Sequence, residues 1–82
     1  MRLWHHPPKI VVWATQDEPK YFIWQKETHH IMTCHHWRFD TGWWRLRRSW
    51  RDYYKVTTDT GLLALISHDL VTDTWYMEKL YD

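Results

Sequence analysis

Residues 53–67 read YYKVTTDTGLLALIS, and this stretch decides the fold class. Its β-branched, aromatic and aliphatic residues fall into two short runs, 53–58 and 62–67, as is typical of strands. Between the runs, Thr58-Asp59-Thr60-Gly61 has an aspartate early and a glycine last, which a type I turn prefers. The stretch therefore predicts an antiparallel β-hairpin.

The same pattern of short apolar runs and turn residues continues on both sides of this hairpin. Asp40-Thr41-Gly42 is a strong hairpin signal because Gly42 suits the positive φ of a three-residue loop. Lys26-Glu27 predicts a tight turn that lacks the usual glycine. Connections this short make neighbouring strands pair antiparallel. Further strands are predicted at residues 9–15, 20–25, 28–39, 43–48 and 74–81, with a turn at 16–19 and a polar loop at 68–73.

Apolar side chains fall on both faces of several predicted strands. In the first strand, Val11 and Trp13 alternate with Ile10 and Val12. A flat sheet with one solvated face would not show this pattern. We therefore predict an all-β fold, a single small antiparallel meander of about six to seven strands coiled into a roll or partly open barrel. The alternative is that one apolar face is buried in a homodimer.

The length and composition of the chain fit one small domain. Its 82 residues include 8 Trp, 5 Tyr and 2 Phe, which supply most of the apolar area available for burial. Residues 9–82 are predicted to form the domain, after an extended leader of residues 1–8 that contains Pro7-Pro8. Cys34 is the only cysteine, and no apolar run has the length of a signal peptide or a membrane span. The expectation is a cytoplasmic protein that does not contact membranes.

Arginine and tryptophan cluster in one segment, although the net charge of the whole chain is only +1. Strand alternation places Trp43, Arg45 and Arg47 on one face, where an aromatic ring beside guanidinium groups could bind a protein partner or single-stranded nucleic acid. The alternative is that Arg45 and Arg47 cover Trp43 or another aromatic ring, or pair with Asp40 or Asp52. The predicted binding surface comprises Trp43, Arg45 and Arg47, extended by Arg38, Arg48, Trp50 and Arg51.

No pattern of catalytic, cofactor or metal residues is predicted. In the strand at 28–39, alternation places His30, Met32, Cys34 and His36 on one face, but a zinc site needs more ligands at recognisable spacings. Cys34 between strand neighbours is more typical of a small buried hydrophobe than of a nucleophile. With two glycines in the chain there is no phosphate-binding loop, and a domain this small is not expected to contain a ligand-sized cavity. We therefore expect a protein that is not an enzyme and binds no cofactor.

Several aromatic and turn motifs together resemble a known family. The family consists of small bacterial domains of unknown function, which occur alone and as a tail on inactive Y-family polymerase-like proteins of a mutagenic DNA-repair system. The resemblance covers roughly residues 9–82 and carries no catalytic motif. The motifs are Pro19-Lys20-Tyr21-Phe22-Ile23-Trp24, Trp37-Arg38, Trp43-Trp44, Arg51-Asp52-Tyr53-Tyr54-Lys55-Val56, Thr60-Gly61-Leu62, Trp75-Tyr76 and Leu80-Tyr81-Asp82.

What this resemblance implies is an accessory module in DNA damage tolerance that contacts DNA or a protein partner. The sequence therefore supports a non-enzymatic binding module that contacts a protein or single-stranded DNA. The alternative is a homodimeric interaction or structural protein with no role at nucleic acid.

Overall fold

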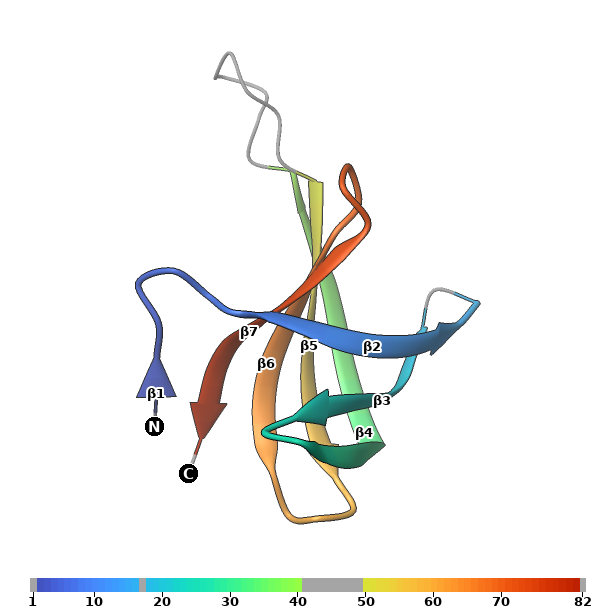
Figure 1. The fold of residues 1–82 in the computed structure, drawn as a ribbon. Helices are drawn as coiled ribbons and strands as arrows, with labels where there is room; N and C mark the ends of the chain where they lie inside the picture. Colours follow the sequence, from blue (N-terminus) through green and yellow to red (C-terminus); the bar gives the residue numbers. More distant parts are fainter. Residues whose placement is uncertain (1, 17, 41–49, 82) are drawn as a thin grey trace.

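The computed structural model describes residues 2–16, 18–40 and 50–81, with side chains for 4–16, 18–36 and 51–81. All of its regular structure is β, as the sequence predicts (Figure 1). The strands are β1 (Arg2–Leu3), β2 (Lys9–Thr15), β3 (Glu18–Trp24), β4 (Glu27–Asp40), β5 (Trp50–Thr58), β6 (Leu63–Asp69) and β7 (Thr74–Tyr81). In these described ranges there is no helix long and apolar enough to cross a membrane.

Six antiparallel strands, β2 to β7, close into a small barrel. Each strand from β2 to β6 pairs with the next along the chain, and β6 pairs with β7. The barrel closes where β2 meets β7, through the pairs Lys9↔Tyr76 and Ile10↔Trp75. The short β1 adds to the other end of β7, with Arg2 opposite Leu80. The predicted meander coiled into a barrel is therefore confirmed.

The long strand β4 changes partner along its length, which bends the sheet. Its first residues pair with β3, from Glu27 to His30, and the rest pair with β5. The register shifts between Ile31 and Thr33, so Met32 is an extra residue in a β-bulge. This bulge makes the simple alternation predicted for the strand wrong. His29 is buried and Ile31 packs against the core, on the same side as Cys34.

The core of the barrel consists of apolar side chains from β3, β5, β6 and β7, most of them large. Tyr54 and Val56 come from β5, and each faces a buried residue of the neighbouring strand β6. Trp4 and Trp24 pack on the outside of this cluster with their ring centroids 5.4 Å apart. The buried hydrophobic residues are Phe22, Tyr54, Val56, Ala64, Ile66, Trp75, Met77 and Leu80.

The turn after β5 forms as its sequence predicts. The N–H of Gly61 donates to the carbonyl of Thr58 at 3.1 Å, and Gly61 has φ +85°, a conformation that glycine adopts without strain. Asp59 fixes the turn to β4, because its N–H donates to the carbonyl of His30 and its carboxylate accepts the N–H of His30. These two hydrogen bonds hold the β5–β6 turn against β4, in addition to the pairing of β4 with β5.

Other predicted boundaries shift or lie outside the described residues. The β3–β4 turn consists of Gln25 and Lys26, both with positive φ, so the two-residue turn sits one position earlier than predicted. β3 begins at Glu18 inside the predicted 16–19 turn, β5 begins at Trp50, and β6 continues to Asp69. The predicted strand at 43–48, with Thr41 and Gly42 before it, lies outside the described residues.

Candidate binding site

Most of the predicted arginine and tryptophan surface lies outside the described residues, so its role stays a prediction. The side chains of Arg38 and Trp50 belong to β4 and β5 but are not described, and their backbones lie opposite Asp52 and Asp40. The remaining members outside the description are Trp43, Arg45, Arg47 and Arg48.

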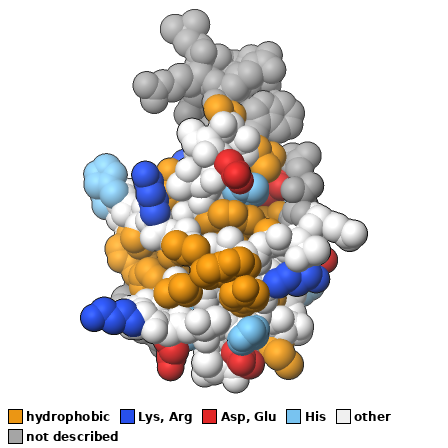
Figure 2. All heavy atoms as spheres, turned by 45° about the vertical axis from the view of Figure 1, so that its right-hand side comes forward, with side chains coloured by type: hydrophobic (Ala, Val, Ile, Leu, Met, Phe, Trp, Pro, Cys, Tyr) orange, Lys and Arg blue, Asp and Glu red, His pale blue; other side chains and the backbone are white. Residues whose placement is uncertain are grey.

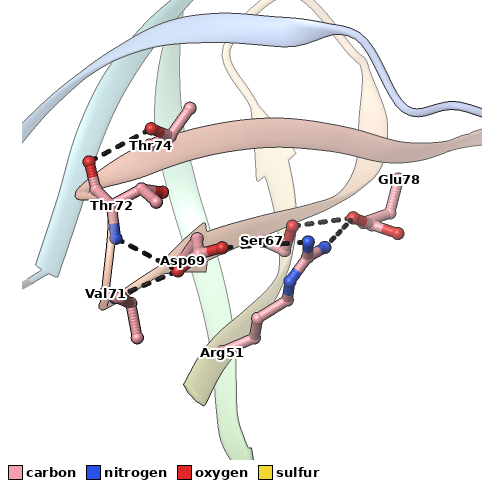
Figure 3. A network of polar contacts seen from close by, with 7 residues as sticks. All are labelled: Arg51, Ser67, Asp69, Val71, Thr72, Thr74 and Glu78. Carbon is pink, nitrogen blue, oxygen red and sulfur yellow. Dashed lines mark hydrogen bonds and ion pairs between the residues drawn. The ribbon is translucent and has the colours of Figure 1, made fainter. Parts of the chain in front are cut away.

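Arg51 is the one member of that surface whose side chain the structure describes, and it has several intramolecular partners (Figure 3). Its guanidinium lies 3.3 Å from the Glu78 carboxylate and 3.9 Å from that of Asp69, and 5.2 Å from the ring centroid of Tyr76. The same Glu78 oxygen accepts the Ser67 hydroxyl hydrogen at 2.7 Å. These contacts join β5, β6 and β7 on the outside of the barrel. The alternative stated for Arg45 and Arg47 falls on residues outside the described ranges and stays untested.

Tyr53 belongs to the same cluster, and the shift of its phenol pKa reflects the charges around it. Burial and the negative charge of Glu78 raise the pKa of the Tyr53 phenol, and Arg51 opposes this shift by charge and by a hydrogen bond. The cluster thus places a neutral phenol next to the paired side chains of Arg51 and Glu78. Because these side chains already contact one another, they are poorly suited to bind a separate ligand.

A contiguous apolar surface lies on the outside of β2, β3 and β4. Figure 2 shows hydrophobic side chains gathered on the side of the molecule where these strands lie. Val11 is 58% exposed and Trp13 42% exposed, and Ile23 opposite Val11 is 37% exposed. Tyr21 and His30 complete the surface, which we call the aromatic face: Val11, Trp13, Tyr21, Ile23 and His30.

The ring systems of the aromatic face form a row across three strands. Trp13 stacks on Tyr21 with a centroid distance of 4.8 Å and an interplanar angle of 15°. Tyr21 in turn lies 5.2 Å from the imidazole of His30. Strand alternation adds Lys9 to the outward side of β2, and the exposed Glu18 and Lys20 at the start of β3 pair with each other at 3.7 Å. The surface is therefore aromatic and apolar, with few charges beside it.

The histidines that the sequence shows in pairs separate into different environments. His29 is buried, stacks on Phe22 and contacts the Thr60 hydroxyl at 2.5 Å through Nδ1, so it helps to hold the β5–β6 turn. His36 lies 3.2 Å from the buried Asp52 carboxylate and stacks on Tyr54. Within the described part of the chain, no three His, Cys, Asp or Glu side chains form a group that could hold a metal ion.

Cys34 of β4 is half-buried. Burial is the main cause that raises the pKa of its thiol, and the negative charge of Glu18 adds to the shift. The thiol is thus mostly protonated at neutral pH. A protonated thiol is a weak nucleophile.

A hollow of about 440 Å³ opens beside the end of β2, a feature that the sequence did not predict. One wall consists of Val12, Ala14 and Gln16, and the opposite wall comes from the β6–β7 hairpin. There, His68 lies parallel to Trp75 at 4.1 Å and contacts the Asp73 carboxylate at 2.7 Å through Nε2. His68 was predicted in a polar loop, but it is a buried residue of β6. The expectation that a domain this small has no ligand-sized hollow is wrong.

No family model matches the chain, and neither a curated protein nor a solved structure matches it. The surfaces of the chain itself are thus the basis for an inference about function.

Proposed function

We propose that this chain is a non-enzymatic binding module that captures a protein partner through the aromatic face. The observation that carries the proposal is the exposure of Trp13, Val11 and Ile23 on one continuous surface of a folded barrel. Contiguous exposed apolar patches are uncommon on small soluble domains and mark interaction sites. Tryptophan and tyrosine are also the residues that contribute most at protein interfaces.

The charge and ring geometry of the aromatic face favour a protein over nucleic acid. Single-strand binding sites combine basic grooves with ring faces that are open to the bases. Here, Trp13 stacks on Tyr21 and Tyr21 lies against His30, so the rings cover one another. Lys9 and Lys20 are the lysines of β2 and β3, Lys20 pairs with Glu18 at 3.7 Å, and the net charge of the chain is +1. Neither property supports strong phosphate binding.

The environment of Cys34 favours binding over catalysis. A cysteine nucleophile needs a lowered thiol pKa, which a nearby cation or base supplies. The pKa of Cys34 is raised instead, and burial is the main cause. The resemblance noted above adds a context to the proposal: a cytoplasmic accessory module whose partner acts in DNA damage tolerance.

The experiment compares partner capture by two double variants of the whole chain. Trp13→Ala with Tyr21→Ala removes the stacked pair, and Leu70→Ala with Val71→Ala removes two exposed apolar side chains of the β6–β7 turn as a matched control. We expect the immobilised first variant to lose the protein that the parent chain captures from its own cell extract, and the control to retain it. The control should stay within about 1 kcal/mol of the parent free energy of unfolding in urea, and the first variant should lose about 1–3 kcal/mol because Tyr21 is half-buried, with both remaining folded.

Three outcomes would contradict the proposal. Undiminished capture by the Trp13 and Tyr21 variant would exclude the aromatic face. Salt-sensitive binding of a labelled single-stranded oligonucleotide that depends on Trp13 would indicate nucleic acid instead of protein. A dimer in light scattering that dissociates when Trp13 and Tyr21 are replaced would mean that the face binds a second copy of the chain.

A further inference from the structure

The edge of β2 that faces away from β3 is open along most of the strand. β2 pairs with β3 from Val11 to Thr15, but its pairing with β7 ends at Ile10, opposite Trp75. Only Thr74 precedes Trp75 in β7, and β2 diverges from that strand beyond this point (Figure 1). Among the described residues, the second edge of Val11–Thr15 therefore has no strand partner.

An open strand edge presents unpaired N–H and C=O groups that an added strand can satisfy. Natural proteins usually protect such edges with charges, prolines or bulges. Residues 11–15 read VVWAT, with no charge and no proline. The register shift near Trp13 places the extra residue, Lys20, in β3, so the backbone of β2 itself stays regular at the shift. The edge is thus competent to accept an extended chain.

The hollow lies directly beside this edge and shares its residues. Val12, Ala14 and Gln16 form one wall. Val12 and Ala14 lie on the same side of β2, and Gln16 follows directly after the strand. In β-strand addition, main-chain hydrogen bonds to the edge supply affinity while alternate side chains enter adjacent pockets. An edge and a pocket on the same strand are the two parts that this mode of binding requires.

The charge of the hollow defines the side chain that it would accept. Asp73 is 88% exposed at the side chain, and His68 holds its carboxylate through Oδ1. A carboxylate can accept several hydrogen bonds, so it retains capacity for a ligand. Among the described residues that line the hollow there is no Lys or Arg, and Trp75 is one of them. These features are complementary to a long side chain with an apolar stem and a cationic end.

We propose that the open edge of β2 and the adjacent hollow bind an extended peptide segment of a partner protein, with an Arg or Lys side chain in the hollow against Asp73. The observation is the juxtaposition of the unpaired Val11–Thr15 edge with a hollow of about 440 Å³. A second copy of β2 would bring Val12 and Ala14 toward the hollow, and these side chains are too small to fill it. The site is on the edge of β2 and stands independently of the aromatic face.

The test uses a displayed library of random decapeptides, selected on the whole folded domain. We expect enriched peptides to share one Arg or Lys with β-branched residues two positions away. The best peptide, made synthetically, should slow amide hydrogen exchange in Val11–Thr15. Replacing its basic residue by Glu should weaken binding at least tenfold.

Matched variants of the domain locate the peptide. Asp73→Asn removes the charge and keeps a side chain that tolerates the φ of +54° at this position, so we expect at least fivefold weaker binding. Glu27→Gln, an exposed acid at the start of β4, should leave the affinity unchanged. Ala14→Phe should also weaken binding by filling the hollow, whereas Met32→Phe, at the exposed bulge of β4, should not.

Several results would overturn this inference. They are the absence of any enriched peptide, equal affinity after the basic residue is replaced by Glu, and protection of amides outside β2. Equal affinity for the Asp73→Asn and parent domains would also overturn it. Tyr21→Ala, which alters the aromatic face without replacing a residue of β2, should leave peptide affinity intact, so loss of peptide binding in that variant would assign the peptide to the aromatic face and not to the edge.

Discussion

Strands β2 and β6 have the same length and similar composition, yet they differ in burial. β2 reads KIVVWAT with five apolar residues, and none of its seven positions is buried. β6 reads LALISHD with four apolar residues, and four of its seven positions are buried, including Ser67 and His68. The more apolar strand is therefore the more exposed one.

The difference follows from what flanks each strand. β6 pairs along its whole length with β5 on one side and β7 on the other, so both of its edges are occupied. β2 pairs with β3 from Val11 to Thr15 and with β7 at Lys9 and Ile10, so each of its residues has a partner strand on one side. Burial in a small barrel thus depends on neighbouring strands more than on the hydropathy of the strand itself. The apolar residues of β2 that folding leaves exposed are the ones available for binding.

The largest expected effect tests this comparison with the same substitution on each side. Ile66 of β6 is fully buried and Ile23 of β3, opposite Val11 of β2, is 37% exposed. We expect Ile66→Ala to lower the free energy of unfolding by about 2–5 kcal/mol, because it leaves a cavity among packed side chains. Ile23→Ala should cost about 1 kcal/mol or less. Urea unfolding followed by tryptophan fluorescence gives both values.

Equal losses for the two variants would break the comparison. They would mean that the β2–β3 hairpin contributes as much packing energy as β6. Ile66→Val, which removes one methylene group, serves as the graded control and should cost about 0.5–1.5 kcal/mol.

A smaller effect is expected from the polar cluster on the outside of β5, β6 and β7. Arg51 and Glu78 are 29% and 18% exposed at their side chains, whereas Lys20 and Glu18 of β3 are 51% and 61% exposed. A double-mutant cycle with Arg51→Met and Glu78→Gln should give a coupling free energy of about 1 kcal/mol. The Lys20 and Glu18 cycle should give about 0–0.5 kcal/mol, because solvent screens that pair. A larger coupling for the β3 pair would contradict the contrast between the two regions.

The smallest expected effect concerns the thiol of Cys34, which lies in β4 shortly after that strand leaves β3 and joins β5. Because burial raises the pKa of its thiol, the folded chain keeps the proton at pH values where the unfolded chain has lost it. Its contribution to stability is thus present below the ordinary thiol pKa and is lost as pH rises through the raised value. We expect a thiol reagent at pH 8 to react several-fold more slowly with the folded chain than with the chain in urea. Equal rates would contradict the raised pKa.

Local sequence patterns were sufficient for much of the fold. The bounds of β2 and β7 and the turn at Gly61 match their predictions, because alternation and turn chemistry depend on neighbouring residues. The bulge at Met32 has no such local signal, since it arises where β4 leaves β3 and joins β5. The two-residue β1 exists only through its pairing with β7.

The candidate sites were harder to predict from the sequence than the strands. Trp13 and Tyr21 were assigned to strands, but their exposure depends on barrel closure, which no single strand reveals. The hollow combines residues 12–16 with residues 68–75, so its walls are more than fifty positions apart in the chain. Only the strand order brings them together.

The pairing of β1 with β7 has a consequence for how this domain can be joined to others. Because Arg2 lies opposite Leu80 and Leu3 opposite Lys79, the first and last described segments are neighbours in one ladder (Figure 1). A host protein could therefore carry the barrel within a surface loop, entering and leaving it at a single point without stretching its own backbone. In such a fusion, β1 and the end of β7 would form a two-stranded stalk that leaves β2 and its hollow free.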